Sequence, residues 1–281
     1  MNTAMDKKLL TIQDISCFGQ CSLTVALPVI SACGIETVIL PSAVLSTHTT
    51  GFKNYTFRDL TEDIPAIEKS WIGNGLKFDA FYTGYVCEKQ IRPILHLMES
   101  CGAEGALRIV DPVMADDGKM YPGFNADFPL KMRALCNGAD FILPNLTEAA
   151  FLLGTECRLE GYDRKFIESM IERLHALGAR NVILTGVSFD PALLGCAISD
   201  GSRIEYDFNP RQKKCSHGTG DLFASVFSGA MMRGKTPLEA AAIAADVVCL
   251  AIPGTPDEHW YGVCFEKVIP DLVDMLKEKP E

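Results

Sequence analysis

The chain has 281 residues, of which 48% are hydrophobic, so it can bury one large core or two modest ones. Its formal net charge of −10 argues against nucleic-acid binding, which needs a clustered basic face. Eleven cysteines are scattered without a Cys-x-x-Cys pair, which argues against a disulfide framework or a zinc site and favours a reducing cytoplasm. The most apolar helical segment, 240–252, is too short to cross a bilayer and carries Asp246, so no membrane partner is expected.

Short apolar runs rich in β-branched residues alternate with helical patterns along most of the chain. Strands are expected at 9–13, 37–41, 80–83, 106–111, 141–144 and 182–185. Helices are expected at 23–32, 63–73, 88–100, 129–137, 147–153 and 165–177. This alternation predicts an α/β fold, a three-layer α/β/α sandwich with a mostly parallel, Rossmann-like central sheet. No linker interrupts it, so a single domain spanning 1–281 is expected.

After Thr185 the pattern changes to two strand-like runs, 194–199 and 203–208, joined across Asp200-Gly201. Such a turn predicts a hairpin, and hence an antiparallel edge of the sheet. Helices are expected to follow at 219–233, 237–252 and about 263–277. Ligands of open α/β sheets bind beyond the carboxyl ends of the strands. Polar residues cluster at these ends: Asp14, Asp111-Pro112, 145–148 and Thr185-Gly186.

The segment His217-Gly-Thr-Gly-Asp221 places two glycines and a carboxylate at the start of a helical pattern. Glycine lets the backbone approach closely, and the first amides of a helix attract phosphate. Gly218, Thr219 and Gly220 could therefore form an anion hole, with Asp221 accepting the proton of an attacking hydroxyl. The alternative is a plain turn with an Asp cap, which an isolated tetrapeptide would favour.

A second polar cluster follows a predicted strand at Asn145-Leu-Thr-Glu148. Asn145 and Glu148 share a helix face and could hold metal-bound water, although an ordinary capping arrangement would be favoured for this motif taken alone. Asp111 could join the same cation or simply form a turn. The glycines and polarity of 115–123 suggest a mobile loop in which Lys119 or Asp116 contacts phosphate, and the alternative is a surface loop.

The stretch Gly229-Ala-Met-Met-Arg-Gly-Lys-Thr236 matches the P-loop pattern letter by letter. A P-loop must follow a strand and open a helix, whereas this stretch continues the helix that begins near Asp221. Gly234 is therefore expected to end that helix, and Thr236-Pro-Leu-Glu239 to open the next one as a capping box.

Taken together, the motifs at 111–114 (Asp-Pro-Val-Met), 144–148 (Pro-Asn-x-Thr-Glu), 185–186 (Thr-Gly) and 218–221 (Gly-Thr-Gly-Asp) resemble the ribokinase-like superfamily of small-molecule kinases. Within it, Ser46-Thr-His-Thr49 and Thr83-Gly-Tyr85 resemble segments of the pyridoxal kinases, also called pyridoxine or pyridoxamine kinases. The similarity runs from about Lys8 to Lys277. It implies ATP-dependent phosphorylation of the 5′-hydroxymethyl group of a vitamin B6 form, giving pyridoxal 5′-phosphate or its relatives.

The same resemblance implies a role for each candidate residue. Thr49 and Tyr85 would line the pyridine site together with Asp14, and Asp111 and Glu148 would hold Mg²⁺. The remaining roles would be ATP binding by Asn145, Thr185, Gly218, Thr219 and Gly220, and proton acceptance from the bound substrate by Asp221. A homodimer is also implied, and dependence on a monovalent cation such as K⁺ is left open.

Two departures from the family pattern affect the function. Asp14 replaces a serine that meets the substrate ring in many members, which leaves the preferred vitamer open. A related branch, the hydroxymethylpyrimidine kinases, carries Gly-x-Gly-Cys where this chain has Asp221, so that activity is the less favoured alternative. A non-catalytic nucleotide- or vitamer-binding protein is the other, although it has no evident use for such a base. Cys215 is expected to be a spectator thiol.

Overall fold

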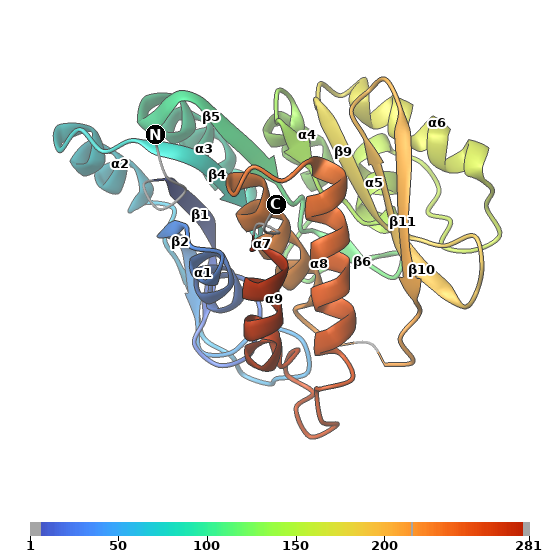
Figure 1. Cartoon of the computed structure of the whole chain (residues 1–281). Coiled ribbons are helices and arrows are strands. Elements are labelled where there is room, and N and C mark those ends of the chain that lie inside the picture. Colours follow the sequence, from blue (N-terminus) through green and yellow to red (C-terminus); the bar gives the residue numbers. More distant parts are fainter. Residues whose placement is uncertain (1–6, 215, 278–281) are drawn as a thin grey trace. The chain divides into compact units, whose positions relative to one another are not determined.

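The computed structural model describes residues 7–214 and 216–277 (Figure 1). The chain forms two compact units, and each is described by itself. Unit 1 comprises Met1–Asp59 with Gln212–Glu281, and unit 2 comprises Leu60–Arg211. A single domain therefore stays a prediction. No helix in the described part of the chain is long and apolar enough to cross a membrane.

Unit 1 is built on strands β1 (Lys8–Ser16), β2 (Glu36–Leu45) and β3 (Phe57–Asp59), in that order. The first two are parallel, and β3 pairs with β2 in the antiparallel sense. Its helices are α1 (Leu23–Ala32), α7 (Thr219–Met232), α8 (Pro237–Ala251), the 3₁₀ helix η2 (Phe265–Val268) and α9 (Ile269–Met275). The core lies between β1 and helices α1 and α7, whose apolar side chains are almost all buried.

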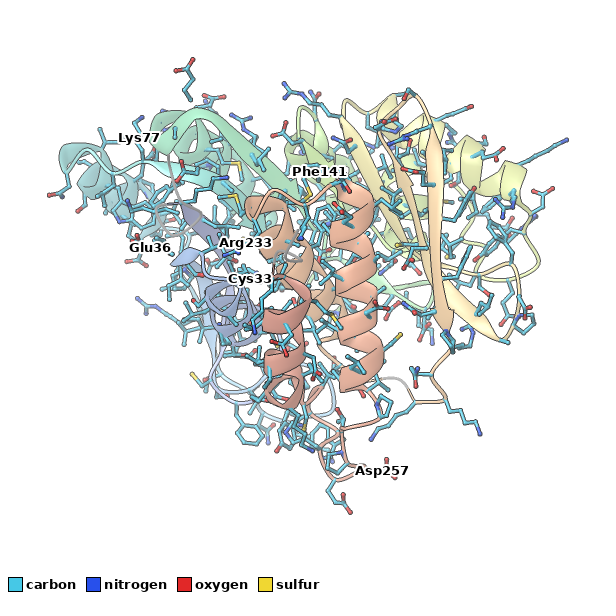
Figure 2. All side chains as sticks on the ribbon, in the orientation of Figure 1. Cys33, Glu36, Lys77, Phe141, Arg233 and Asp257 are labelled. Carbon is cyan, nitrogen blue, oxygen red and sulfur yellow. The ribbon has the colours of Figure 1, made fainter. Side chains whose placement is uncertain are left out.

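The α1 and α7 helices pack closely because a glycine lies at their contact. A Cβ on Gly229 would lie 2.4 Å from the Cys33 sulfur, so only glycine allows this approach. Arg233, at the end of α7, lies beside Cys33 at the end of α1 (Figure 2). Burial raises the pKa of the Cys33 thiol to about 12, and the Arg233 charge opposes this only in part. The contact that joins the two helices is therefore structural rather than reactive.

Unit 2 contains a six-stranded sheet in the order β11-β10-β9-β8-β5-β4. The strands β4 (Phe78–Thr83), β5 (Gly102–Val110), β8 (Phe141–Ile142) and β9 (Asn181–Val187) are parallel, and β10 (Leu193–Ser199) and β11 (Ile204–Pro210) are antiparallel. Its helices are α2 (Ile64–Gly73), α3 (Glu88–Cys101), α4 (Phe128–Cys136), α5 (Leu146–Leu153) and α6 (Arg164–His175). A small hairpin pairs β6 (Ala115–Asp116) with β7 (Lys119–Met120).

The six predicted parallel-type strands, the hairpin and the helices up to α8 are confirmed, with ends that differ by a few residues. The stretch that matches the P-loop pattern does not form a P-loop, as predicted. Helix α7 runs to Met232, Gly234 has a left-handed φ of 84°, and Thr236 caps α8 in a capping box with Glu239. The sequence did not predict β3 or the β6–β7 hairpin, which are too short to show an alternating pattern. The last predicted helix is shorter than expected and begins as the 3₁₀ turn η2.

Candidate active site

The start of α7 approaches the segment before α1 very closely. Gly218 has a left-handed φ of 77°, and a Cβ there would lie 2.1 Å from the backbone oxygen of Gln20. Both facts restrict position 218 to glycine. Gly220, by contrast, has nothing within 4 Å of its Cβ position, so the protein leaves open space beside it. The first amides of α7 have no acceptor within the helix, as in any α-helix, and this opening is where they could receive an anion.

Asp221 is the third residue of α7 and the carboxylate closest to these amides in sequence. Burial, together with the nearby Asp14 charge, raises the pKa of Asp221 to about 7, while the backbone N–H of Ser22 donates to the carboxylate and opposes the shift. A carboxyl group with a pKa near neutrality exchanges its proton readily at physiological pH. It is therefore suited to act as a general base.

Asp14 lies with Asp221 in unit 1, as the motif positions suggested. It does not cap the turn after the first strand, because β1 continues to Ser16 and the register shifts between Gln13 and Ile15. Its carboxylate accepts hydrogen bonds from the hydroxyls of Ser16, at 3.1 Å, and Ser22. Burial nevertheless raises the pKa of Asp14. Asp14 and Asp221 thus lie in one region of unit 1, and the charge of Asp14 raises the pKa of Asp221.

Ser22 connects the two carboxylates, and we did not single it out from the sequence. Its hydroxyl bonds Asp14 and its backbone N–H bonds Asp221. Its φ of 51° is left-handed, a conformation that costs a non-glycine residue roughly 1–3 kcal/mol and is found mostly at functional sites. A serine before a helix looks like an ordinary N-cap, yet its side chain makes no cap bond to α1. Nothing in the sequence therefore signalled this role.

Cys21 precedes Ser22 in the same region. Burial raises the pKa of its thiol, and Asp221 and Asp14 raise it further because a thiolate would repel both carboxylates. Cys21 is therefore not a nucleophile at physiological pH. Cys215, expected to be a spectator, lies outside the described residues. The ten described cysteines are all free, so no disulfide forms among them.

Thr49 lies on the loop after β2 and is half-buried beside His48. The Nδ1 atom of His48 accepts the Thr50 N–H at 3.2 Å, so Nε2 carries the proton and donates to the Tyr261 oxygen at 3.0 Å. Burial lowers the pKa of His48, which keeps the ring neutral. Phe52 and Trp260 pack against this ring, at centroid distances of 4.9 and 6.4 Å. The sequence did not predict this aromatic group, whose members come from distant loops.

In unit 2, Asn145 and Glu148 form the capping box at the start of α5. The Asn145 side-chain Oδ1 atom accepts the Glu148 N–H, and the Glu148 Oε2 atom accepts the Asn145 N–H, both at 2.9 Å. Glu148 Oε1 also accepts the Met114 N–H at 3.1 Å. Burial raises the pKa of Glu148 to about 8, these backbone donors oppose the shift, and the neighbouring Asp116 charge adds to it. The capping alternative is thus realised in full, and the predicted metal role is neither confirmed nor contradicted by it.

The first turn of α5 also holds the segment expected to be a mobile loop. Asn145 donates from its side-chain amide to the Ala115 oxygen at 2.9 Å, and the Thr147 hydroxyl accepts the Gly118 N–H at 3.0 Å. These bonds hold both the start and the turn of the β6–β7 hairpin against α5. Closure of 115–123 over a substrate stays a prediction.

The remaining predicted residues of unit 2 lie at strand ends, as expected from the sequence. Asp111 follows β5, is buried, and donates its N–H to the Thr83 oxygen at 2.9 Å. Thr185 lies in β9 and forms an isolated parallel bridge with Asn145. Tyr85 packs on Phe124 at 5.2 Å, beside Gly123. The three residues therefore line the same edge of the unit 2 sheet as Glu148.

The donor chemistry of this edge fits magnesium carried in by a nucleotide. No group of three His, Cys, Asp or Glu residues suited to a metal ion occurs among the described residues. Mg²⁺ usually takes only one or two carboxylates and completes its shell with phosphates and water. Glu148 offers a buried carboxylate whose charge is disfavoured until a cation approaches, and its oxygens keep lone pairs beyond those used by backbone donors.

Residues 22–260 match the family described as phosphomethylpyrimidine kinase. The chain is 25% identical to the pyridoxal kinase of Dictyostelium discoideum, over 83% of this chain and 81% of that protein. It superposes on a Bacteroides thetaiotaomicron structure described as a phosphomethylpyrimidine kinase and solved with pyridoxal, with a TM-score of 0.89, 31% identity and 95% coverage of both chains. The pyridoxal kinase structure of Lactobacillus plantarum gives a TM-score of 0.88 at 30% identity, covering 96% of this chain and 97% of that one. These likenesses confirm the predicted fold class and the resemblance to pyridoxal kinases.

Proposed function

Because this chain belongs to the phosphomethylpyrimidine kinase family, we propose that it transfers the terminal phosphoryl group of ATP to the 5′-hydroxymethyl group of pyridoxal, pyridoxine or pyridoxamine. Similarity to pyridoxal kinases over most of the chain supports this substrate class. The single observation that carries the chemistry is Asp221, a half-buried carboxyl whose pKa is raised to about 7, beside the open amide end of α7. A protein that only binds a nucleotide needs no such base.

A hydroxymethyl group is a poor nucleophile at neutral pH, and the charge of ATP repels other anions. Asp221 would accept the hydroxyl proton as the new O–P bond forms, and the Ser22 N–H would hold the carboxylate in place. The amides of Gly218, Thr219 and Gly220 would receive the negative charge of the transferring group. Neither role requires a covalent enzyme intermediate.

The unit 2 residues would supply the nucleotide side of the reaction. Asp111 and Glu148 would hold Mg²⁺, and Asn145 and Thr185 would contact phosphate or nucleotide. When bound, the metal neutralises phosphate charge. Thr49, Tyr85 and Asp14 would meet the pyridine ring. Two further proposals are a homodimer, which the family resemblance implies, and a cytoplasmic location, which the scattered cysteines favour.

Formation of ADP by the purified protein tests the proposal. Pyridoxal, pyridoxine, pyridoxamine and hydroxymethylpyrimidine are offered in parallel with Mg-ATP, and the phosphorylated products are identified by mass spectrometry. We expect turnover of at least one B6 vitamer and loss of that turnover in Asp221→Asn. The matched control is Asp246→Asn, which alters an exposed carboxylate on α8. No phosphorylated B6 product would refute the proposal. Exclusive phosphorylation of hydroxymethylpyrimidine, the less favoured alternative, would replace it.

A further inference from the structure

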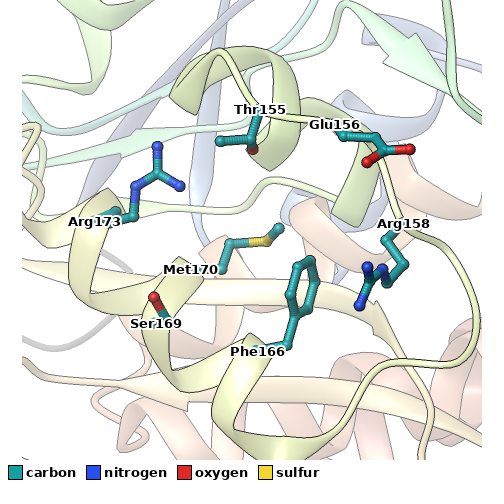
Figure 3. A pocket seen from close by; sticks show the side chains of 7 residues that line it. All are labelled: Thr155, Glu156, Arg158, Phe166, Ser169, Met170 and Arg173. Atoms are coloured by element: carbon teal, nitrogen blue, oxygen red, sulfur yellow. The ribbon is translucent and has the colours of Figure 1, made fainter.

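A cavity of about 240 Å³ lies in unit 2, in a region to which the proposed reaction assigns no residue (Figure 3). One wall is the face of α6 formed by Phe166, Ser169, Met170 and Arg173, which follow the i, i+3, i+4, i+7 spacing of a single helix surface. The other wall is the segment after α5, with Thr155, Glu156 and Arg158. Each wall therefore contributes one arginine.

The two arginines have guanidinium groups available to a ligand. Arg158 lies over the Phe166 ring, 5.4 Å from its centroid, and Arg173 donates to the Leu153 oxygen at 3.3 Å. Within 7–214 and 216–277, neither guanidinium forms an ion pair. Figure 3 shows the two side chains on opposite sides of the cavity, with Met170 and Phe166 between them. An anion entering here would meet several N–H donors without displacing a carboxylate partner.

Phe166 and Met170 are the two apolar residues that line the cavity. Met170 is buried, and Phe166 stacks with Tyr162 at 5.7 Å, which fixes the ring orientation. Aromatic rings and methionine sulfur both favour contact with an aromatic ligand. The volume corresponds to roughly eight water molecules at about 30 Å³ each, and lies just below the usual range of sites for larger ligands. The cavity therefore suits a small ring with one charged group.

From this arrangement we infer that the cavity binds a small aromatic anion, a single ring carrying a phosphate or a carboxylate. The ring contacts Met170 and the edge of Phe166, whose face already carries the Arg158 guanidinium, and Arg158 and Arg173 bind the acid group. The hydroxyls of Ser169 and Thr155 line the same cavity and can donate to the anion as well. Glu156 lies at the side of Arg158 in Figure 3 and weakens anion binding by repulsion.

Calorimetric titration of the full chain with phenyl phosphate, benzoate and inorganic phosphate tests the inference. Mg-ATP and an acceptor are absent, so the readout does not depend on catalysis. We expect saturable binding of phenyl phosphate or benzoate, and the stronger of the two identifies the acid group. Arg158→Gln should weaken that binding roughly fivefold to tenfold, the range for a partly exposed charge-assisted contact. Arg92→Gln, which removes an exposed arginine of α3 in the same unit, is the matched control and should bind as the parent does.

Glu156→Gln should strengthen binding of the same anion, a gain that partial unfolding cannot imitate. Phe166→Leu should weaken phenyl phosphate or benzoate while leaving any weak binding of inorganic phosphate unchanged. The inference is wrong if neither aromatic anion saturates, or if Arg158→Gln binds as tightly as the parent. Inorganic phosphate that binds as tightly as phenyl phosphate would also overturn the inference, because Phe166 and Met170 would then contribute nothing to the affinity.

Discussion

Replacing Asp221 with asparagine should make the protein more stable and almost inactive. Asparagine keeps the shape of the side chain and an oxygen that can accept the Ser22 N–H, but it removes the half-buried charge. The pKa of Asp221 is about 7 in the folded protein, against an ordinary value of 3.8. Between these two pH values the folded state binds more protons than the unfolded state, so stability falls as the pH rises. Above pH 7 the full penalty is present, and below about pH 4 it is absent.

The magnitude follows from the size of this pKa shift. A shift of about three units at ~1.4 kcal/mol per unit corresponds to roughly 4 kcal/mol in the free energy of unfolding. Urea unfolding of parent and variant at pH 4 and pH 8 measures it. We expect the two proteins to have similar stability at pH 4 and the variant to be more stable by up to about 4 kcal/mol at pH 8. Asp246→Asn should show no such pH-dependent difference, because residue 246 is exposed.

Asp221→Asn should lower the catalytic rate, although it raises the stability of the fold. A base must be deprotonated to act, so kcat/KM of the parent should rise with pH through a midpoint near 7. The variant should lose roughly 10²–10⁴-fold in turnover, the usual contribution of a positioned base, and should lose this rising limb. If the variant were less stable than the parent at pH 8, or if its single-turnover rate matched the parent, Asp221 would be a helix cap and the reasoning would fail.

Three further predictions concern the other residues of the candidate site. Glu148→Gln and Asp111→Asn should each raise the magnesium concentration needed for half-maximal activity, because each removes a charge placed near the metal. Asp14→Ser should change the relative kcat/KM among the three vitamers, mainly through KM, and urea unfolding of the same variant reports any structural role. Gly218→Ala should destabilise the fold by roughly 1–3 kcal/mol, since φ is left-handed and the new methyl group meets backbone, whereas Gly220→Ala faces open space and should cost well under that.

For each of these predictions, one experimental result would contradict it. The control variant Glu99→Gln changes an exposed residue and should leave the magnesium titration unchanged. If Glu148→Gln and Asp111→Asn also leave it unchanged, Glu148 and Asp111 serve only in capping and turn formation. Unchanged vitamer ratios with a lowered melting temperature would make Asp14 structural. Equal stabilities of Gly218→Ala and Gly220→Ala in urea would show that the close approach to Gln20 is not a constraint.

The sequence by itself determined the order and type of the elements. Helix α8 was predictable because Thr236, Pro237 and Glu239 form a local signal, and the same local logic excluded the P-loop match. The strands followed from β-branched runs between helical patterns. The short strands β3, β6 and β7 could not be predicted, because their few residues are mostly polar and show no period, whereas the two-residue strand β8 lies in an apolar run that did predict it.

The electrostatics of the site were decided by tertiary structure alone. Asp221 and Glu148 could be named from motifs, but their raised pKa values come from burial, which no local sequence encodes. Ser22 contacts Asp221 across most of the chain length and holds a strained backbone that only the surrounding packing maintains. Local sequence patterns involve only a few neighbouring residues. The desolvation of a carboxyl group and its distance from other charges depend on all the residues that pack around it. The sequence therefore indicated which residues belong to the site, and the fold set their charge, partners and geometry.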